Sequence, residues 1–252
     1  MTFNNVVIII PTYNEEPTIE ETLRQVLRVA SSINEHHVNI LVFDSGSTDR
    51  TASLVKTMQQ TEPRIHLQTE THKSGLGSAY LQAMRHALYS MNADVVFEFD
   101  ADLSHQPHYI APMLEHLKMH DVVIGSRYVN GGDIPNDWAW HRKFLSVLGN
   151  YVARFCLTYR YKDFTSGFRA TRKAALSRAL PRRFLSNHYA YKIELLWTLH
   201  CNKAQIYEYP IVFVDRKNGQ SKLPTNSILD SLRVLLMLRL RSWFKLFSAV
   251  VS

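Results

Sequence analysis

Short apolar runs alternate along the first half of this chain with longer mixed stretches that carry helix-start signals. Val6–Ile10 is a continuous β-branched run, which is typical of a strand buried on both faces. Further strands are predicted over residues 38–43, 65–68, 94–99 and 121–124. The alternation of strands with helices predicts an α/β protein whose central sheet is mostly parallel and flanked by helices.

Polar residues mark where the first helices begin. Thr18–Glu21 has the spacing of a capping box and predicts a helix that extends to about Ser32. Asp49 is placed to cap the helix that follows the second strand. A third helix is predicted over residues 77–89, between the third and fourth strands.

A polar turn with at least one carboxylate follows three of the predicted strands. These turns are Pro11–Glu15, Asp44–Asp49 and Asp100–Asp102. The carboxyl ends of parallel strands share one edge of a sheet, and ligands bind beyond that edge. Any one turn alone is more often only a turn, but three on one edge favour a shared site.

The third turn raises a physical question, because Asp100 and Asp102 place two like charges one residue apart at the end of an apolar strand. Each carboxylate is costly to remove from water. One interpretation is a simple turn, for which Asp is well suited. The other is a divalent cation held between the two carboxylates. This segment alone leaves both interpretations open.

Composition favours one large domain. The chain has 252 residues, 46% of them hydrophobic, with no linker-like tract and no internal repeat. Cys156 and Cys201 lie in no metal-ligand spacing, and both are interpreted as buried apolar residues in a reducing compartment. The N-terminus predicts a first strand rather than a signal peptide. No stretch of about 18 uncharged apolar residues predicts a transmembrane helix.

The net charge of +7 indicates an anionic partner. Nucleic acid, a phosphorylated substrate and an acidic membrane surface are the candidates. No nucleic-acid-binding signature is visible, so phosphate and membrane are favoured over nucleic acid. The alternative is that the surplus cations only aid solubility.

The motifs together resemble those of family 2 glycosyltransferases with the GT-A nucleotide-sugar-binding fold, in particular the dolichol/polyprenol-phosphate mannose synthase group. A lone D-x-D is weak evidence, but here an ordered series covers nearly the whole chain. The series is Pro11–Glu15, Asp44–Asp49, Gly75–Tyr80, Asp100–His105, Gly125–Tyr128, Asp163–Arg169 and Arg216–Lys222.

The chain also departs from the family pattern. Ser45 stands where the family often has Asp or Asn, and Arg50 replaces a frequent Gly. His188 and Lys192 stand in a segment where relatives usually show Gly and Gln, respectively. The departures concern the acceptor and sugar side more than the nucleotide side.

The resemblance implies an inverting, metal-dependent enzyme that moves mannose from GDP-mannose to a polyprenyl phosphate. Asp100 and Asp102 would hold Mg²⁺ or Mn²⁺, with Ser104 as a further ligand. Asp102, Arg127 and Arg142 are expected at the reaction centre. The expected nucleotide-sugar pocket comprises Pro11, Tyr13, Glu15, Val42, Asp44, Asp100, Ala101, Asp102, Arg127, Arg216 and Lys222. The alternatives are hexosyl transfer, such as glucosyl transfer, from a UDP-sugar to the same lipid, or a non-catalytic nucleotide-sugar-binding subunit.

A phosphate acceptor would also remove the need for a dedicated general base. Inverting transfer to a hydroxyl usually requires one. A phosphate monoester has a second pKa of about 6, so it is already largely dianionic near neutral pH. The remaining work is positioning and charge neutralisation.

The last residues predict a second unit, 226–252, after a GT-A domain at 1–225. Asp230, Arg233, Arg241 and Lys245 lie on about one third of a helical wheel, whereas Arg239 falls on the opposite side. This pattern suits an amphipathic helix in the headgroup region of an anionic leaflet, on the cytoplasmic face of a membrane. A membrane-anchored partner protein would serve the same end. Packing against the core is the alternative, and charges disfavour a membrane span.

Overall fold

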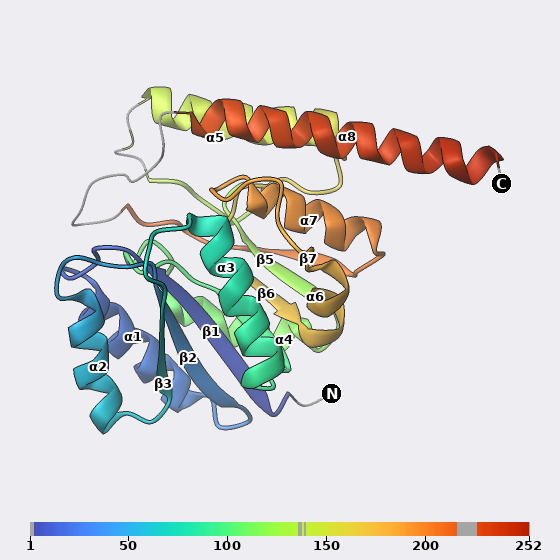
Figure 1. Cartoon of the computed structure of the whole chain (residues 1–252). Helices are drawn as coiled ribbons and strands as arrows, with labels where there is room; N and C mark the ends of the chain where they lie inside the picture. Colours follow the sequence, from blue (N-terminus) through green and yellow to red (C-terminus); the bar gives the residue numbers. More distant parts are fainter. Residues whose placement is uncertain (1–2, 136–137, 139, 216–225, 252) are drawn as a thin grey trace.

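The centre of the fold is one mixed sheet with helices on both faces (Figure 1). The computed structural model describes residues 3–135, 138, 140–215 and 226–251. Within them the strands are β1 (Asn5–Thr12), β2 (His37–Asp44), β3 (Ile65–Thr69), β4 (Val95–Glu98), β5 (Val122–Ser126), β6 (Arg169–Arg172) and β7 (Ile206–Pro210). Their order is β3-β2-β1-β4-β6-β5-β7. Of the strands in the described residues, only β6 runs antiparallel to its neighbours, β4 and β5, so the prediction of a mostly parallel sheet is confirmed.

The first four of the described helices each connect strands that run parallel to each other. The described helices are α1 (Ile19–Ser32), α2 (Thr51–Thr61), α3 (Leu76–Arg85), α4 (Ile110–Leu117), α5 (Trp140–Cys156), α6 (Lys173–Ala179), α7 (Tyr191–Cys201) and α8 (Ser227–Val251). A π-helical turn, His86–Ser90, continues α3, and a 3₁₀ turn, Pro107–Tyr109, precedes α4.

Different helices cover the two faces of the sheet, because side chains alternate between the faces along each strand. Val7 and Ile9 of β1 pack in a core shared with α3, α6 and α7. Val6, Ile8 and Ile10 pack in a second core with α1, α2 and α4. All five side chains are fully buried. Two covered faces therefore explain why β1 is apolar without interruption.

The predicted helix starts are right in position but not in every contact. α1 begins at Ile19, yet Thr18 makes no side-chain cap hydrogen bond, so the expected capping-box bond is absent. The Thr18 hydroxyl instead donates to the Glu15 carbonyl, 3.3 Å away. Asp49 Oδ1 accepts the Thr51 N–H at 2.9 Å, at the start of α2.

The second half of the chain departs most from the sequence predictions. β6 and β7 are only four and five residues long, and β6 carries Arg169 and Arg172, which hide it from a search for apolar runs. The prediction of two buried cysteines is also wrong. Cys201 is exposed and Cys156 is half-buried. Each is the last residue of its helix.

α5 and α8 lie side by side, far from α1 and α2 (Figure 1). α8 buries Val234, Leu235 and Leu238 in the core that also contains α7. Part of α8 therefore packs as the core alternative predicts, while its other side lies on the surface. Among the described residues, no helix combines the length and the apolarity that a membrane crossing needs.

Candidate active site

The sheet brings the three carboxylate-bearing turns together. β1 lies between β2 and β4, so the turns after these three strands are neighbours at one edge. The Ser45 N–H donates to the Thr12 carbonyl at 2.9 Å, which ties the second turn to the end of β1. On the other side, Thr22 Oγ1 donates to the Ala101 carbonyl at 2.8 Å. The common edge predicted from the strand pattern is therefore present.

A cavity of about 220 Å³ opens beside the end of β1, and we call it the β1 cavity. Its lining residues are Pro11, Thr12, Tyr13, Glu15, Ser45, Lys73, Gly75, Leu76, His188 and Tyr189. Pro11, Tyr13 and Glu15 were predicted to line a nucleotide-sugar pocket. Lys73 was not, although its Nζ lies 3.7 Å from the centroid of the Tyr13 ring. Residues 188–189 join from the far half of the chain, which no local pattern could reveal.

Asp44 is only 2% exposed, and its carboxylate holds the turn after β2. Thr12 Oγ1 donates to Asp44 Oδ1 at 2.9 Å, and the Ser47 N–H donates to Oδ2 at 2.9 Å. The backbone at Val42 is likewise buried, within β2. The expected contact of Asp44 with a nucleotide base stays a prediction.

The Asp100–Asp102 turn is shaped by His105. The Asp100 N–H donates to His105 Nδ1 at 3.1 Å, so the ring proton resides on Nε2, which lies 3.5 Å from Asp100 Oδ2. The ring stacks on Phe168, with 5.0 Å between centroids. Burial lowers the pKa of His105, although Asp100 acts in the opposite direction. Leu103 adopts a left-handed φ of 60°, a conformation that is uncommon for a bulky residue.

Ser104 supplies the observation that bears on a metal. Its hydroxyl is buried and has no hydrogen-bond partner in the part of the chain that the structure describes. Its N–H donates to Asp102 Oδ1 at 3.1 Å. Two carboxylates and one hydroxyl are hard oxygen donors of the kind that Mg²⁺ and Mn²⁺ prefer. In the described ranges, no three His, Cys, Asp or Glu side chains form a metal-binding group, so a metal here would need further ligands from a substrate or water.

A buried ion pair lies next to this turn. Arg169 Nε donates to Glu98 Oε1 at 2.6 Å and Nη2 donates to Oε2 at 2.9 Å, while both residues are at most 2% exposed. The Tyr191 hydroxyl also donates to Glu98, at 2.9 Å. Burial opposes the charge on Arg169, but Glu98 outweighs it and raises the Arg169 pKa. Burial is also the main cause that raises the pKa of Tyr80 and of Tyr191.

Sequence reasoning assigned no role to this pair. Glu98 is a charged residue inside an otherwise apolar strand, which was the available signal. The partner of Glu98 could not be named, because Arg169 lies 71 positions away and on an antiparallel strand. The pair fixes the end of β4 against α7, and so supports the Asp100 turn.

Arg127, predicted to bind phosphate, lies in a buried ion pair with Asp163. Nε and Nη2 each donate to the carboxylate at 2.8 Å, and Nη2 also donates to Thr165 Oγ1 at 2.7 Å. The Arg127 and Asp163 side chains are 10% and 0% exposed. Burial opposes both charges, but each partner outweighs it, so the Arg127 pKa is raised and the Asp163 pKa is lowered. Phosphate binding by Arg127 stays a prediction.

Arg142 is more accessible than Arg127. Its side chain is 41% exposed, Nη1 donates to Asp215 at 2.9 Å, and the guanidinium lies 3.8 Å from the centroid of the Trp138 ring. Arg216 and Lys222, both predicted to bind the diphosphate, lie outside the described residues.

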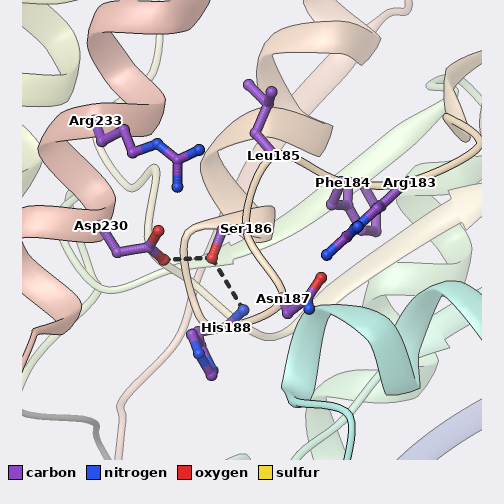
Figure 2. A pocket seen from close by; sticks show the side chains of 8 residues that line it. All are labelled: Arg183, Phe184, Leu185, Ser186, Asn187, His188, Asp230 and Arg233. Carbon is purple, nitrogen blue, oxygen red and sulfur yellow. Dashed lines mark hydrogen bonds between the residues drawn. The ribbon is translucent and has the colours of Figure 1, made fainter.

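A larger cavity, of about 590 Å³, lies between residues 183–188 and the start of α8 (Figure 2). The Ser186 hydroxyl donates to Asp230 of α8, and Ser186 Oγ accepts the His188 N–H at 2.9 Å. None of the sequence-predicted site residues lines it. His188 lines both cavities, so this segment lies between α8 and the β1 cavity.

The same arrangement of strands and helices occurs in solved sugar-transferring enzymes. Glucosyl-3-phosphoglycerate synthase from Mycobacterium tuberculosis, solved with Mn²⁺, UDP-glucose and phosphoglyceric acid, superposes with a TM-score of 0.63 at 18% identity, over 94% of this chain and 80% of that one. A mannosyltransferase from Pyrobaculum calidifontis, solved with GDP-Man and Mn²⁺, superposes with a TM-score of 0.59 at 22% identity, over 88% and 59% of the two chains.

The fold and the carboxylate-bearing edge thus define a glycosyltransferase of the GT-A fold. The chain belongs to glycosyl transferase family 2, whose family model matches residues 7–180. It is 36% identical to polyprenol monophosphomannose synthase of Mycolicibacterium smegmatis, over 89% of this chain and 83% of that protein. It is also 36% identical to undecaprenyl-phosphate mannosyltransferase of Micrococcus luteus, over 86% and 87% of the two proteins.

Proposed function

We propose that this enzyme transfers mannose from GDP-mannose to a polyprenyl phosphate with inversion at the sugar. The observation that carries the proposal is the pair of relatives at 36% identity, both named for mannose and for a polyprenol-type lipid. The ordered motifs from Pro11 to Arg169 support it, because they lie along the same sheet edge as the β1 cavity.

A divalent cation, Mg²⁺ or Mn²⁺, is part of the proposal. Asp100 and Asp102 would hold it, and the unpartnered hydroxyl of Ser104 suits a third ligand. The cation would neutralise the negative charge that grows on the departing nucleoside diphosphate. Pro11, Tyr13 and Glu15 would hold the nucleotide sugar in the β1 cavity, where the cation of Lys73 adds an attraction for phosphate.

The acceptor phosphate needs cations more than it needs a base. A phosphate monoester is largely dianionic near neutral pH, so it can attack without giving up a proton to the protein. Arg142 is half-exposed and would contribute a bidentate donor to this phosphate. Arg127 would act beside it, from its buried pair with Asp163.

The enzyme would work at a membrane surface, where the lipid acceptor resides. Large apolar side chains are exposed along one stripe of α5 at helical spacing, namely Trp140, Phe144, Leu148, Tyr151 and Phe155. α8 exposes a matching set spaced four residues apart, namely Ile228, Leu232, Leu236 and Leu240. We call these nine residues the apolar face. Contiguous exposed apolar patches of this kind mark interaction sites.

Cations beside the apolar face fit an anionic leaflet. Arg233, Arg239 and Arg241 are exposed on α8. Each such cation near an anionic surface contributes on the order of 1 kcal/mol. Peripheral binding on the cytoplasmic face, with or without a membrane-anchored partner protein, completes the proposal.

One assay tests the activity. The full chain is incubated with a short polyprenyl phosphate, Mn²⁺ or Mg²⁺, and radiolabelled GDP-mannose, UDP-glucose or other UDP-hexoses in parallel. Label is expected in the lipid fraction from GDP-mannose. Transfer only from a UDP-sugar would show that the donor is that UDP-sugar and not GDP-mannose. Nucleotide-sugar binding without any turnover would indicate a non-catalytic subunit.

A further inference from the structure

Lys192, at the start of α7, is a buried cation that the proposed mechanism has not used. The residue is only 6% exposed. A Cβ added to Gly167 would lie 2.2 Å from Lys192 Nζ and 3.3 Å from His105 Cε1. The end of the lysine therefore rests against the backbone of Gly167 and close to the His105 ring. The missing side chain at Gly167 is what leaves room for it.

Among the described residues, no carboxylate contacts the amine of Lys192. Across the residues that the structure describes, Nζ forms no ion pair within 4.0 Å and no hydrogen bond, and the centroid of the Tyr189 ring lies 5.5 Å away. A lysine with so little exposed surface is normally paired with an anion, so this position favours an anion that enters with the substrate. The ion pairs nearby are complete without Lys192, since Arg169 is bound to Glu98 and Arg127 to Asp163.

The surroundings of Lys192 are those of the candidate reaction centre. The His105 ring beside Lys192 also contacts Asp100, whose N–H donates to Nδ1 at 3.1 Å and whose Oδ2 lies 3.5 Å from Nε2. Lys192 and Asp100 therefore approach the same histidine ring, beside the turn that would hold a cation. The family resemblance supports a chemical role for this residue, because relatives usually have a neutral Gln at this position. In this chain the position supplies a positive charge.

We propose that Lys192 binds a phosphoryl oxygen of a substrate at the reaction centre, which rests on the proposed function in needing phosphate-bearing substrates. The ammonium would supply a point charge that strengthens as negative charge grows there. A phosphoryl group reaches this centre from two sources, the diphosphate of the donor and the phosphate monoester of the acceptor. Both present the same chemistry to Nζ.

Binding measurements on the full chain separate the two sources. Lys192→Met keeps the length of the side chain and removes the charge, and Lys192→Gln restores the residue usual in the family. Calorimetric titrations use three probes: GDP with Mn²⁺, inorganic pyrophosphate with Mn²⁺, and farnesyl phosphate. Lys56→Gln is the matched control, because it removes an exposed lysine on α2. No probe carries mannose, so the result does not depend on which sugar is transferred.

We expect Lys192→Met to weaken the binding of at least one probe tenfold or more. Weaker GDP and pyrophosphate binding with unchanged farnesyl phosphate binding assigns Lys192 to the donor, and the reverse assigns it to the acceptor. The denaturant midpoint should stay the same or rise, because an unpaired buried charge has been removed. If Lys192 only stabilised the fold, Lys192→Met would instead lower the denaturant midpoint and leave the binding affinities unchanged.

Gly167→Ala provides an independent displacement of Nζ without removing it. Its new Cβ would occupy the space of the ammonium, so Gly167→Ala should weaken the binding of the same probe as Lys192→Met does. The double variant should bind that probe no more weakly than Lys192→Met alone. Affinities within twofold of the wild type for all three probes in both Lys192 variants would overturn the proposal. A wild type that binds none of the probes would overturn it together with the proposed function.

Discussion

At the scale of residues, Arg127 and Arg142 look alike in the sequence and differ in their surroundings. Both are arginines that the motif order places near phosphate. Arg127 is 10% exposed and paired with a carboxylate that is fully buried, whereas Arg142 is 41% exposed and paired with Asp215 at the surface. Substitution of Arg127 should therefore mainly lower stability, whereas substitution of Arg142 should mainly lower activity.

Arg127→Ala should destabilise the fold by about 3–5 kcal/mol, because Asp163 would be left as an uncompensated buried charge. The sequence alone predicts a loss of turnover with little loss of stability, and the buried pair changes that expectation. Arg142→Ala should cost roughly 1 kcal/mol or less in stability, since exposed pairs contribute little, and should lower turnover more. Urea denaturation and initial rates measure the two effects. Equal stability losses in the two variants would contradict the distinction.

Asp102→Ala should remove most of the activity and leave the fold intact, since the diphosphate would lose the counter-charge of the cation. EDTA should have the same effect on the unmutated chain, and added Mn²⁺ or Mg²⁺ should restore turnover. Glu115→Ala is the control, because that side chain is 60% exposed and pairs with Lys118, three residues further along the chain. Near wild-type turnover in EDTA would remove the metal from the mechanism.

At the scale of elements, the start of α8 is joined to the rest of the protein by a polar contact. Ser186 donates to Asp230 and accepts from the N–H of His188, which lines the β1 cavity (Figure 2). Gly77 N–H donates to the Asn187 carbonyl at 2.7 Å, so the same segment also supports the start of α3. One short segment thus contacts both the C-terminal helix and the active-site edge.

Ser186→Ala should loosen the first turns of α8 at a cost of about 1 kcal/mol, the usual value of one hydrogen bond. Amide hydrogen exchange should quicken in α8 and around residues 186–188. Ser231→Ala is the matched control, because its hydroxyl bonds to the Ser227 carbonyl within α8 itself. Unchanged exchange in α8 with Ser186→Ala would show that apolar packing alone holds the helix.

At the scale of the whole molecule, the proposed function requires the apolar face to contact the membrane while the active-site edge binds the phosphate of a lipid in that membrane. α5 and α8 lie side by side (Figure 1), and each exposes several large apolar side chains, whereas exposed apolar residues usually occur singly. Val234, Leu235 and Leu238 are buried beneath α8, so deleting the helix would also damage the core. Point substitutions on the exposed side are therefore the cleaner test.

The full chain should sediment with anionic vesicles, and Phe155→Glu combined with Leu236→Glu should reduce that binding at least fivefold. These side chains are 77% and 61% exposed, so the fold should tolerate the charges. Met119→Glu is the control, because Met119 is 75% exposed and lies outside α5 and α8. A chain that ends near Thr225 should also fail to sediment. Equal sedimentation by wild type and double variant would exclude the apolar face as the membrane contact.

The sequence by itself determined the first half of the fold and the edge of the sheet where the site lies. Val6–Ile10 had to be a strand covered on both faces, because five consecutive apolar side chains leave no polar face. Parallel strands then placed Pro11–Glu15, Asp44 and Asp100 together, since their carboxyl ends share one edge. Local periodicity and the rules of parallel sheets were sufficient for these predictions.

Only the tertiary structure decided which charges meet. Arg127 pairs with Asp163 and Arg169 with Glu98, 36 and 71 positions apart, and no local pattern encodes such distances. The short strand β6 is antiparallel and carries arginines, so apolar periodicity does not reveal its place between β4 and β5, where Arg169 pairs with Glu98. Lys192 became informative for the same reason. Its burial, and its position against Gly167 with no carboxylate in contact among the described residues, depend on how the chain packs.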